Sequence, residues 1–209
     1  MEIINDPIFK YFFIGSNLIA LACWLTTLIT NNFSQIDRLW SILPTVYAWF
    51  FLYTAYSNNN NWQRVLLMTG LITLWGVRLT YNYWRKGGYK KGEEDYRWTH
   101  VKKMFYYPEI KILFHLFNFV FIAFIQNWLL LGLAVPLWHV QTNKSVQLNR
   151  NDYLAAFCFV CFFFTEIIAD EQQWRFQTNK KNWLNNKLTA NENEIKDFKN
   201  GFLTRGLFK

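Results

Sequence analysis

Five long apolar runs dominate this sequence, and each is close to the length that a helix needs to cross a bilayer. A helix of about 20 residues covers the roughly 30 Å of hydrocarbon in a membrane. The five runs are residues 11–30, 39–57, 65–84, 112–135 and 153–169. They are continuous and do not alternate between polar and apolar residues, so they predict helices and not the strands of a closed barrel.

The expected fold is therefore all-α, a polytopic membrane helix bundle with about five transmembrane helices in a single membrane domain, 1–209. The composition agrees, because hydrophobic residues make up 52% of the chain and aromatic residues 21%. A water-soluble domain has too little core to bury so many large rings. The mean hydropathy is only -0.02, because polar residues gather between the runs and in an amphiphilic, basic tail, 170–209.

Lysine and arginine predict the orientation of the five helices. With the N-terminus outside, 17 of these residues fall on the cytosolic-type side and four on the opposite side. Positive residues favour the cytosolic side of a membrane. We expect an integral, multi-pass protein of the endoplasmic reticulum or another organelle membrane, and the pattern does not distinguish between these.

Charge and metal-ligand spacing exclude other classes of function. The net charge is +8, but the basic residues flank lipid-length segments, which argues against nucleic acid as a partner. Cys158 and Cys161 have no further ligands nearby, so packing thiols are the preferred interpretation. The three histidines lack metal-ligand spacing, and no metal is expected.

Arg78 lies within an apolar run, where an ionisable group is costly and calls for a function or a partner. Arg78, Asn82 and Arg85 are spaced i, i+4 and i+7, so they share one face of a helix, with Tyr81 beside them. A cationic stripe with an amide suits a phosphate or pyrophosphate group. A purely structural ion pair for Arg78 remains an equal alternative.

A second ionisable group lies near the end of the fifth run. Glu166 and Asp170 are spaced i, i+4, and Arg175 follows. With Arg78 and Arg85 on the same side of the membrane, a shared site is geometrically feasible, and an interhelical ion pair without ligand is the alternative.

Two other charged segments favour structural interpretations. The run Glu93–Asp95 is expected to be a solvated charge cluster. Asp37 is expected at the start of the second predicted helix, where its negative charge interacts favourably with the helix dipole.

Five strings together resemble one family over nearly the whole chain from about residue 36 onwards. They are DRLWSILP, WGVRLTYNYWRKGGYKKGEEDYRW, FNFVFIAFIQNWLLLGLAVP, EIIADEQQWRFQ and GFLTRGLFK. This pattern resembles the uncharacterised branch of the steroid 5-alpha-reductase-like membrane proteins. The GEEDYRW string looks characteristic of that branch.

The resemblance implies a reductase that uses NADPH held among transmembrane helices. Its substrate would be a lipid or steroid-like small molecule with a carbon–carbon double bond conjugated to a carbonyl. The resemblance places Arg78, Asn82, Arg85, Glu166, Asp170 and Arg175 near the cofactor. It makes Tyr81 the candidate donor to the carbonyl, in the manner of an oxyanion hole.

One departure from the family leaves alternatives open. In the family, a segment resembling YSRHPNYFGE and a further membrane portion follow the GLFK-like string, so the sequence predicts a C-terminally truncated reductase. One alternative is a non-catalytic membrane subunit or scaffold within a larger membrane protein complex. Another is a membrane methyltransferase, because isoprenylcysteine methyltransferases share the wider superfamily.

Overall fold

The computed structural model describes residues 2–105, 111–142 and 147–209, and regular structure within these ranges is helical. The chain divides into two compact units, and the boundary along the chain falls in the first turn of α9, between residues 152 and 153. The first unit ends at Asp152 and the second begins at Tyr153. The predicted all-α class is confirmed.

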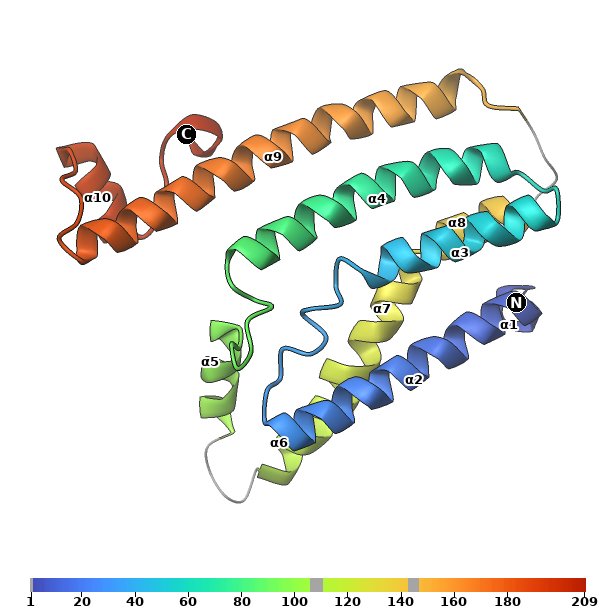
Figure 1. Ribbon diagram of the computed structural model, residues 1–209, viewed down its shortest axis with the longest axis horizontal. Helices are drawn as coiled ribbons and strands as arrows, with labels where there is room; N and C mark the ends of the chain where they lie inside the picture. The colour runs from blue at the N-terminus through green and yellow to red at the C-terminus, as the bar shows by residue number, and fades with distance from the viewer. Residues whose placement is uncertain (1, 106–110, 143–146) are drawn as a thin grey trace. The chain divides into compact units, whose positions relative to one another are not determined.

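The first unit is built from four long helical segments and several short ones (Figure 1). Its elements are α1 (Glu2–Asn5), α2 (Pro7–Thr30), α3 (Leu43–Ser57), α4 (Trp62–Arg85), α5 (Tyr96–Met104), α6 (Lys111–Phe117), η2 (Asn118–Ile125), α7 (Gln126–Gly132) and α8 (Val135–Thr142). The segment η2 is a π-helix that joins α6 to α7. Helix α3 packs along α4, and α2 packs against η2 and α7.

Local chemistry sets the ends of these helices. The side chain of Asp6 accepts a hydrogen bond from the Phe9 amide at 2.9 Å, and Pro7 opens α2. Asn31 ends α2 in the left-handed conformation. Helix α3 begins at Leu43 and not at residue 39, and Pro44 lies in its first turn as expected.

The core of the first unit lies where α3 meets α4 and α8. Phe51, Ala48 and Val65 are fully buried there, together with Leu130 of α7. Phe12 of α2 packs on Phe51 with the ring centroids 4.5 Å apart. Each of these helices thus buries one apolar face inside the bundle and leaves its other apolar face for contact with lipid.

The second unit contains α9 (Arg150–Leu184), from Tyr153 onwards, with α10 (Glu192–Asn200) and the 3₁₀ turn η3 (Gly206–Phe208). Helix α9 continues 15 residues beyond the predicted run, so the start of the basic tail is helical. Phe198 of α10 packs against the rings of Phe176 and Trp183 of α9 at 5.6 and 5.7 Å.

Among the residues that the structure describes, three continuous helical stretches are long and apolar enough to cross a membrane: Pro7–Thr30, Ile112–Thr142 and Arg150–Leu184. They are consistent with an integral membrane protein. Helix α3 has only 15 residues, and α4 has 24 residues but carries Arg64, Arg78 and Arg85. The number of five spans therefore stays a prediction.

Candidate functional site

A pocket of about 520 Å³ lies beside the packed pair α3 and α4. Its walls are mostly apolar, with hydroxyl groups on both helices and three large rings near the C-terminal end of α4. The lining residues are Ser41, Ile42, Thr45, Val46, Gly76, Val77, Thr80, Tyr81, Trp84 and Tyr89. Such a composition suits a largely apolar molecule that carries a few hydrogen-bonding groups.

A stripe of small residues on α4 lets the two helices approach closely beside this pocket. Thr69 donates to the carbonyl of Ala48 at 3.2 Å, and Thr80 shares a 2.7 Å hydrogen bond with Ser41. A Cβ on Gly76 would lie 2.8 Å from the carbonyl oxygen of Ser41 and closer still to Thr45. Glycine is therefore needed at position 76 for this contact.

Tyr81, the predicted carbonyl donor, lies on the wall of the pocket and is 54% exposed. The guanidinium carbon of Arg85 lies 5.4 Å from the centroid of its ring. Trp84 packs at 6.0 Å on the same ring. The positive charge of Arg85 is thus held beside the one predicted catalytic residue.

The predicted stripe on α4 forms, because α4 is helical through all of its members. Asn82 is buried, and the Nε atoms of Arg78 and Arg85 are buried as well. Both arginines are half-buried as whole residues, and partial burial of a charged group is costly unless other groups compensate it.

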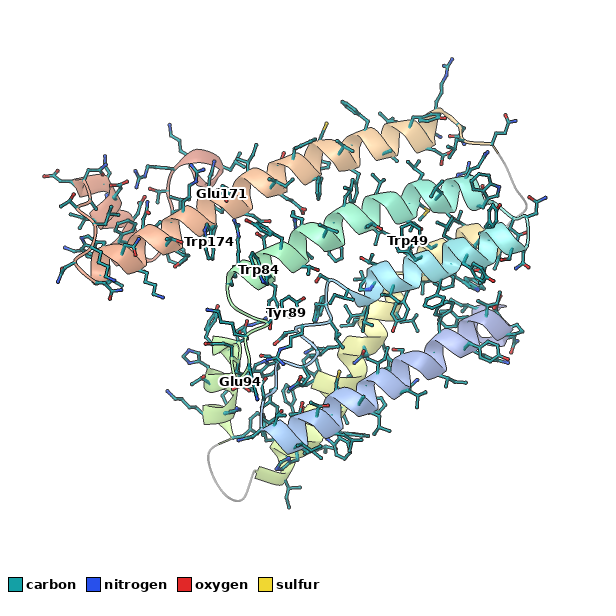
Figure 2. All side chains as sticks on the ribbon, in the orientation of Figure 1. Trp49, Trp84, Tyr89, Glu94, Glu171 and Trp174 are labelled. Carbon is teal, nitrogen blue, oxygen red and sulfur yellow. The ribbon has the colours of Figure 1, made fainter. Side chains whose placement is uncertain are left out.

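Figure 2 shows Trp84 and Tyr89 near the C-terminal end of α4. The hydroxyl of Tyr89 donates to the carbonyl of Arg38 at 3.1 Å, and its ring meets that of Tyr83 edge to face at 5.0 Å. Tyr89 thereby ties the end of the pocket to the connection between α2 and α3.

The connection between α2 and α3 is locked to the loop before α5. Asp37 accepts a 2.8 Å hydrogen bond from the indole of Trp98, and Glu94 accepts one of 2.7 Å from the Phe33 amide. Glu94 also pairs with Lys102 at 2.8 Å. Asp95 pairs with Arg97 at 2.7 Å, so the expectation of a solvated charge cluster was wrong for Glu94 and Asp95, whereas Glu93 is exposed.

Asp37 corrects a second expectation. It lies in a series of turns before α3 and does not begin a helix. Burial raises the pKa of its carboxyl above the usual value, although the Trp98 hydrogen bond and the charge of Arg97 act in the opposite direction. For Asp95, burial also opposes ionisation, but hydrogen bonds from Arg97 prevail and lower its pKa.

The remaining predicted residues lie in the second unit. Glu166 and Asp170 occupy successive turns of α9, as their spacing required. Arg175 pairs with Glu171, one turn earlier, at 2.8 Å. Their joint site with the arginines of α4 stays a prediction.

Arg175 lines a second pocket, of about 310 Å³, within the second unit. Arg205 lines it too and pairs with Asp197 at 3.2 Å. The pocket is formed by Gln172, Arg175, Phe176, Asn179, Glu194, Phe198, Leu203, Arg205 and Gly206. Each of the two guanidinium groups at this cavity is paired with a carboxylate, and Glu194, 3.7 Å from Arg205, is also in the lining.

Sequence reasoning missed Arg205 and the hydroxyls of Ser41, Thr45 and Thr80. Of these hydroxyls only Thr80 left a signal, because residues 69, 73, 76 and 80 are all small and recur at helical spacing. Arg205 left none, because it follows α10 and reaches α9 only through the fold.

Comparison with known proteins gives the family. Residues 23–192 match a family model described as a protein of unknown function, DUF1295. An uncharacterized protein of Schizosaccharomyces pombe is 34% identical over 201 residues, which is 95% of this chain. The chain spans 56% of the length of that relative. No solved structure matches. The chain therefore belongs to the DUF1295 family, which is the steroid 5-alpha-reductase-like family.

Proposed function

We propose that this protein is a membrane-embedded reductase that uses NADPH to reduce a conjugated carbon–carbon double bond in a lipid or steroid-like substrate. The observation that carries the proposal is the pocket beside α3 and α4, with Tyr81 on its wall and Arg85 above the Tyr81 ring. Membership of the steroid 5-alpha-reductase-like family supports the same reaction class.

The apolar pocket suits the substrate. Rings of Tyr81, Trp84 and Tyr89 offer flat surfaces at one end, and hydroxyls of Ser41 and Thr80 lie farther along its wall. Its volume of about 520 Å³ lies within the common range for small-molecule sites. A flat apolar molecule with one or two oxygen atoms would therefore satisfy both kinds of surface.

The polar residues suit the cofactor. NADPH carries several phosphate groups, and Arg78 and Arg85 share one face of α4. These guanidinium groups would hold the phosphates through charge-assisted hydrogen bonds. Asn82, on the same helix, offers an amide for neutral hydroxyl or amide groups of the same molecule.

In the proposed mechanism, the phenol of Tyr81 donates a hydrogen bond to the carbonyl oxygen of the substrate. NADPH held by Arg78 and Arg85 would supply the hydride for the β-carbon of the conjugated bond. Negative charge then develops on the carbonyl oxygen, where the Tyr81 donor and the nearby Arg85 cation stabilise it. A proton from water completes the α-carbon, and the apolar walls keep other water away.

Calorimetric titration of NADPH into the full-length protein in nanodiscs tests the proposal. We expect saturable binding, at least tenfold weaker in Arg78→Ala, and no competition from S-adenosylmethionine. The matched control is Arg150→Ala, which changes an arginine at the start of α9, distant in sequence from the predicted residues. The proposal would be contradicted if no NADPH binding were seen and Arg78→Ala left the calorimetric signal unchanged. Binding of S-adenosylmethionine alone would instead favour methyl transfer.

A further inference from the structure

In the second unit, positions along α9 can be converted into depths relative to the membrane surface. Its apolar part, 153–169, measures about 26 Å at 1.5 Å per residue, slightly less than the hydrocarbon thickness of about 30 Å. None of its most apolar window is buried inside the protein, so lipid must cover it. Asp170 and Glu171 therefore mark the membrane surface at the end of this part.

The chain leaves that surface along α9 and then returns to it. Helix α10 lies far from the surface, because Phe198 packs between the levels of Phe176 and Trp183. A Cβ on Gly201 would lie 3.8 Å from the Nζ of Lys180. At 1.5 Å per residue, Lys180 is about 15 Å beyond Asp170, which places Phe202 in water.

The chain reaches the level of the membrane surface again beside Gln172. The amide of Leu207 donates to Oε1 of Gln172 at 3.0 Å, and a Cβ on Gly206 would lie against the end of the same side chain. Gly206 also adopts a φ of 68°, which favours glycine. Gln172 is about 3 Å beyond Asp170, so η3 lies at the level of the membrane surface.

The side chains of η3 are suited to the membrane surface. Leu207 is 50% exposed and Phe208 42% exposed, although both are large and apolar. The segment 170–209 carries eight lysines and arginines against five acidic residues, and Lys209 directly follows Phe208. Exposed apolar side chains beside basic residues are the composition of segments that lie in the headgroup region.

We infer that η3 docks in the membrane interface, with Leu207 and Phe208 inserted among lipid headgroups beside α9. The lipid surface is the partner of this segment, and Gln172 fixes its depth. One wall of the Arg175 and Arg205 pocket then lies at the membrane surface, because Gly206 lines that pocket. The inference concerns the second unit alone and holds whether or not the protein binds NADPH.

Nitroxide labels on single cysteines test this inference. Cys23, Cys158 and Cys161 are replaced by alanine, and labels are placed by Leu207→Cys, Phe208→Cys or Phe202→Cys in separate samples of the full chain. The protein is reconstituted in vesicles of phosphatidylcholine and phosphatidylserine. Power saturation with oxygen and with a water-soluble nickel chelate then reports the depth of each label.

Phe202 is the matched control, because it is apolar and 74% exposed but lies at the level of Lys180. We expect labels at 207 and 208 to be accessible to oxygen and protected from nickel, and the label at 202 to show the reverse. Equal nickel accessibility at all three positions would overturn the inference, and so would protection of all three. The two adjacent positions give independent readings if one variant fails to fold.

Discussion

At the scale of single residues, the carboxylates of this protein hold other parts of the chain in place. Asp37 binds the indole of Trp98, and Glu94 binds both the Phe33 amide and Lys102. Figure 2 shows Glu94 in the loop before α5. These contacts fix the connection that leads into α3, and with it one end of the pocket beside α3 and α4.

Asp37→Ala should destabilise the protein by about 1–2 kcal/mol, because it leaves the buried Trp98 indole without its acceptor. Asp37→Asn keeps an acceptor and should change stability much less at neutral pH. Thermal unfolding in detergent compares the two variants with the parent. Equal losses for both variants would show that the hydrogen bond to Trp98 does not matter.

The raised pKa of Asp37 also predicts a pH dependence. Burial favours the protonated form in the folded state, so its contribution to stability is present below the unfolded pKa of about 4. It is lost as the pH rises through the raised folded pKa. Thermal unfolding at increasing pH above about 4 should therefore show a smaller loss of stability for Asp37→Asn than for the parent.

Tyr81→Phe should lower turnover by about 100-fold with little change in NADPH affinity, because it removes only the donor to the developing oxyanion. Tyr53→Phe is the control, since Tyr53 is exposed on α3 and is absent from the lining of the pocket. Oxidation of NADPH with saturating substrate measures turnover. Equal rates for Tyr81→Phe and the parent would remove Tyr81 from the mechanism.

At the scale of elements, the packing of α3 on α4 depends on small side chains that face each other. Gly76→Ala should destabilise the protein by about 1–3 kcal/mol, because the new methyl group collides with Thr45 and with the Ser41 carbonyl. Gly70→Ala on the same helix meets nothing within 4 Å and should be neutral or stabilising. Chemical unfolding of both variants decides the matter, and equal effects would contradict the packing shown here.

The elements themselves were largely predictable. Apolar runs located the long helices, and Pro44 marked the first turn of α3. The run ahead of α3 was mistaken for helix because Trp40 and Leu39 are apolar, whereas the contacts of Asp37 and Arg38 hold this stretch in turns. Such contacts join residues about 50 to 60 positions apart, so no local pattern could reveal them.

Individual site residues were predictable only where helical spacing brings them together. Arg78, Asn82 and Arg85 follow from periodicity on α4, and Tyr81 from its neighbours. The pocket wall also needs Ser41 and Tyr89, which reach α4 through the folding of separate loops. Arg205 joins Arg175 only because α10 folds back on α9.

At the scale of the whole molecule, the distribution of lysine and arginine predicts five spans with the N-terminus outside. The loop that contains Lys90 should then lie on the cytosolic side and the connector at Asn59 on the opposite side. Single cysteines at the two positions, labelled in sealed vesicles with an impermeant maleimide, should react from opposite sides. If both cysteines react from the same side, α4 does not cross the membrane.

The central claim is that this family member transfers a hydride to a conjugated lipid. Membranes that contain the full-length protein are incubated with NADPH deuterated at its transferable position, and the lipids are analysed by mass spectrometry. The account predicts one lipid class that gains a single deuterium at the β-carbon of a conjugated carbonyl, and much less of it with Tyr81→Phe. If NADPH binds and no lipid gains deuterium, the claim is contradicted.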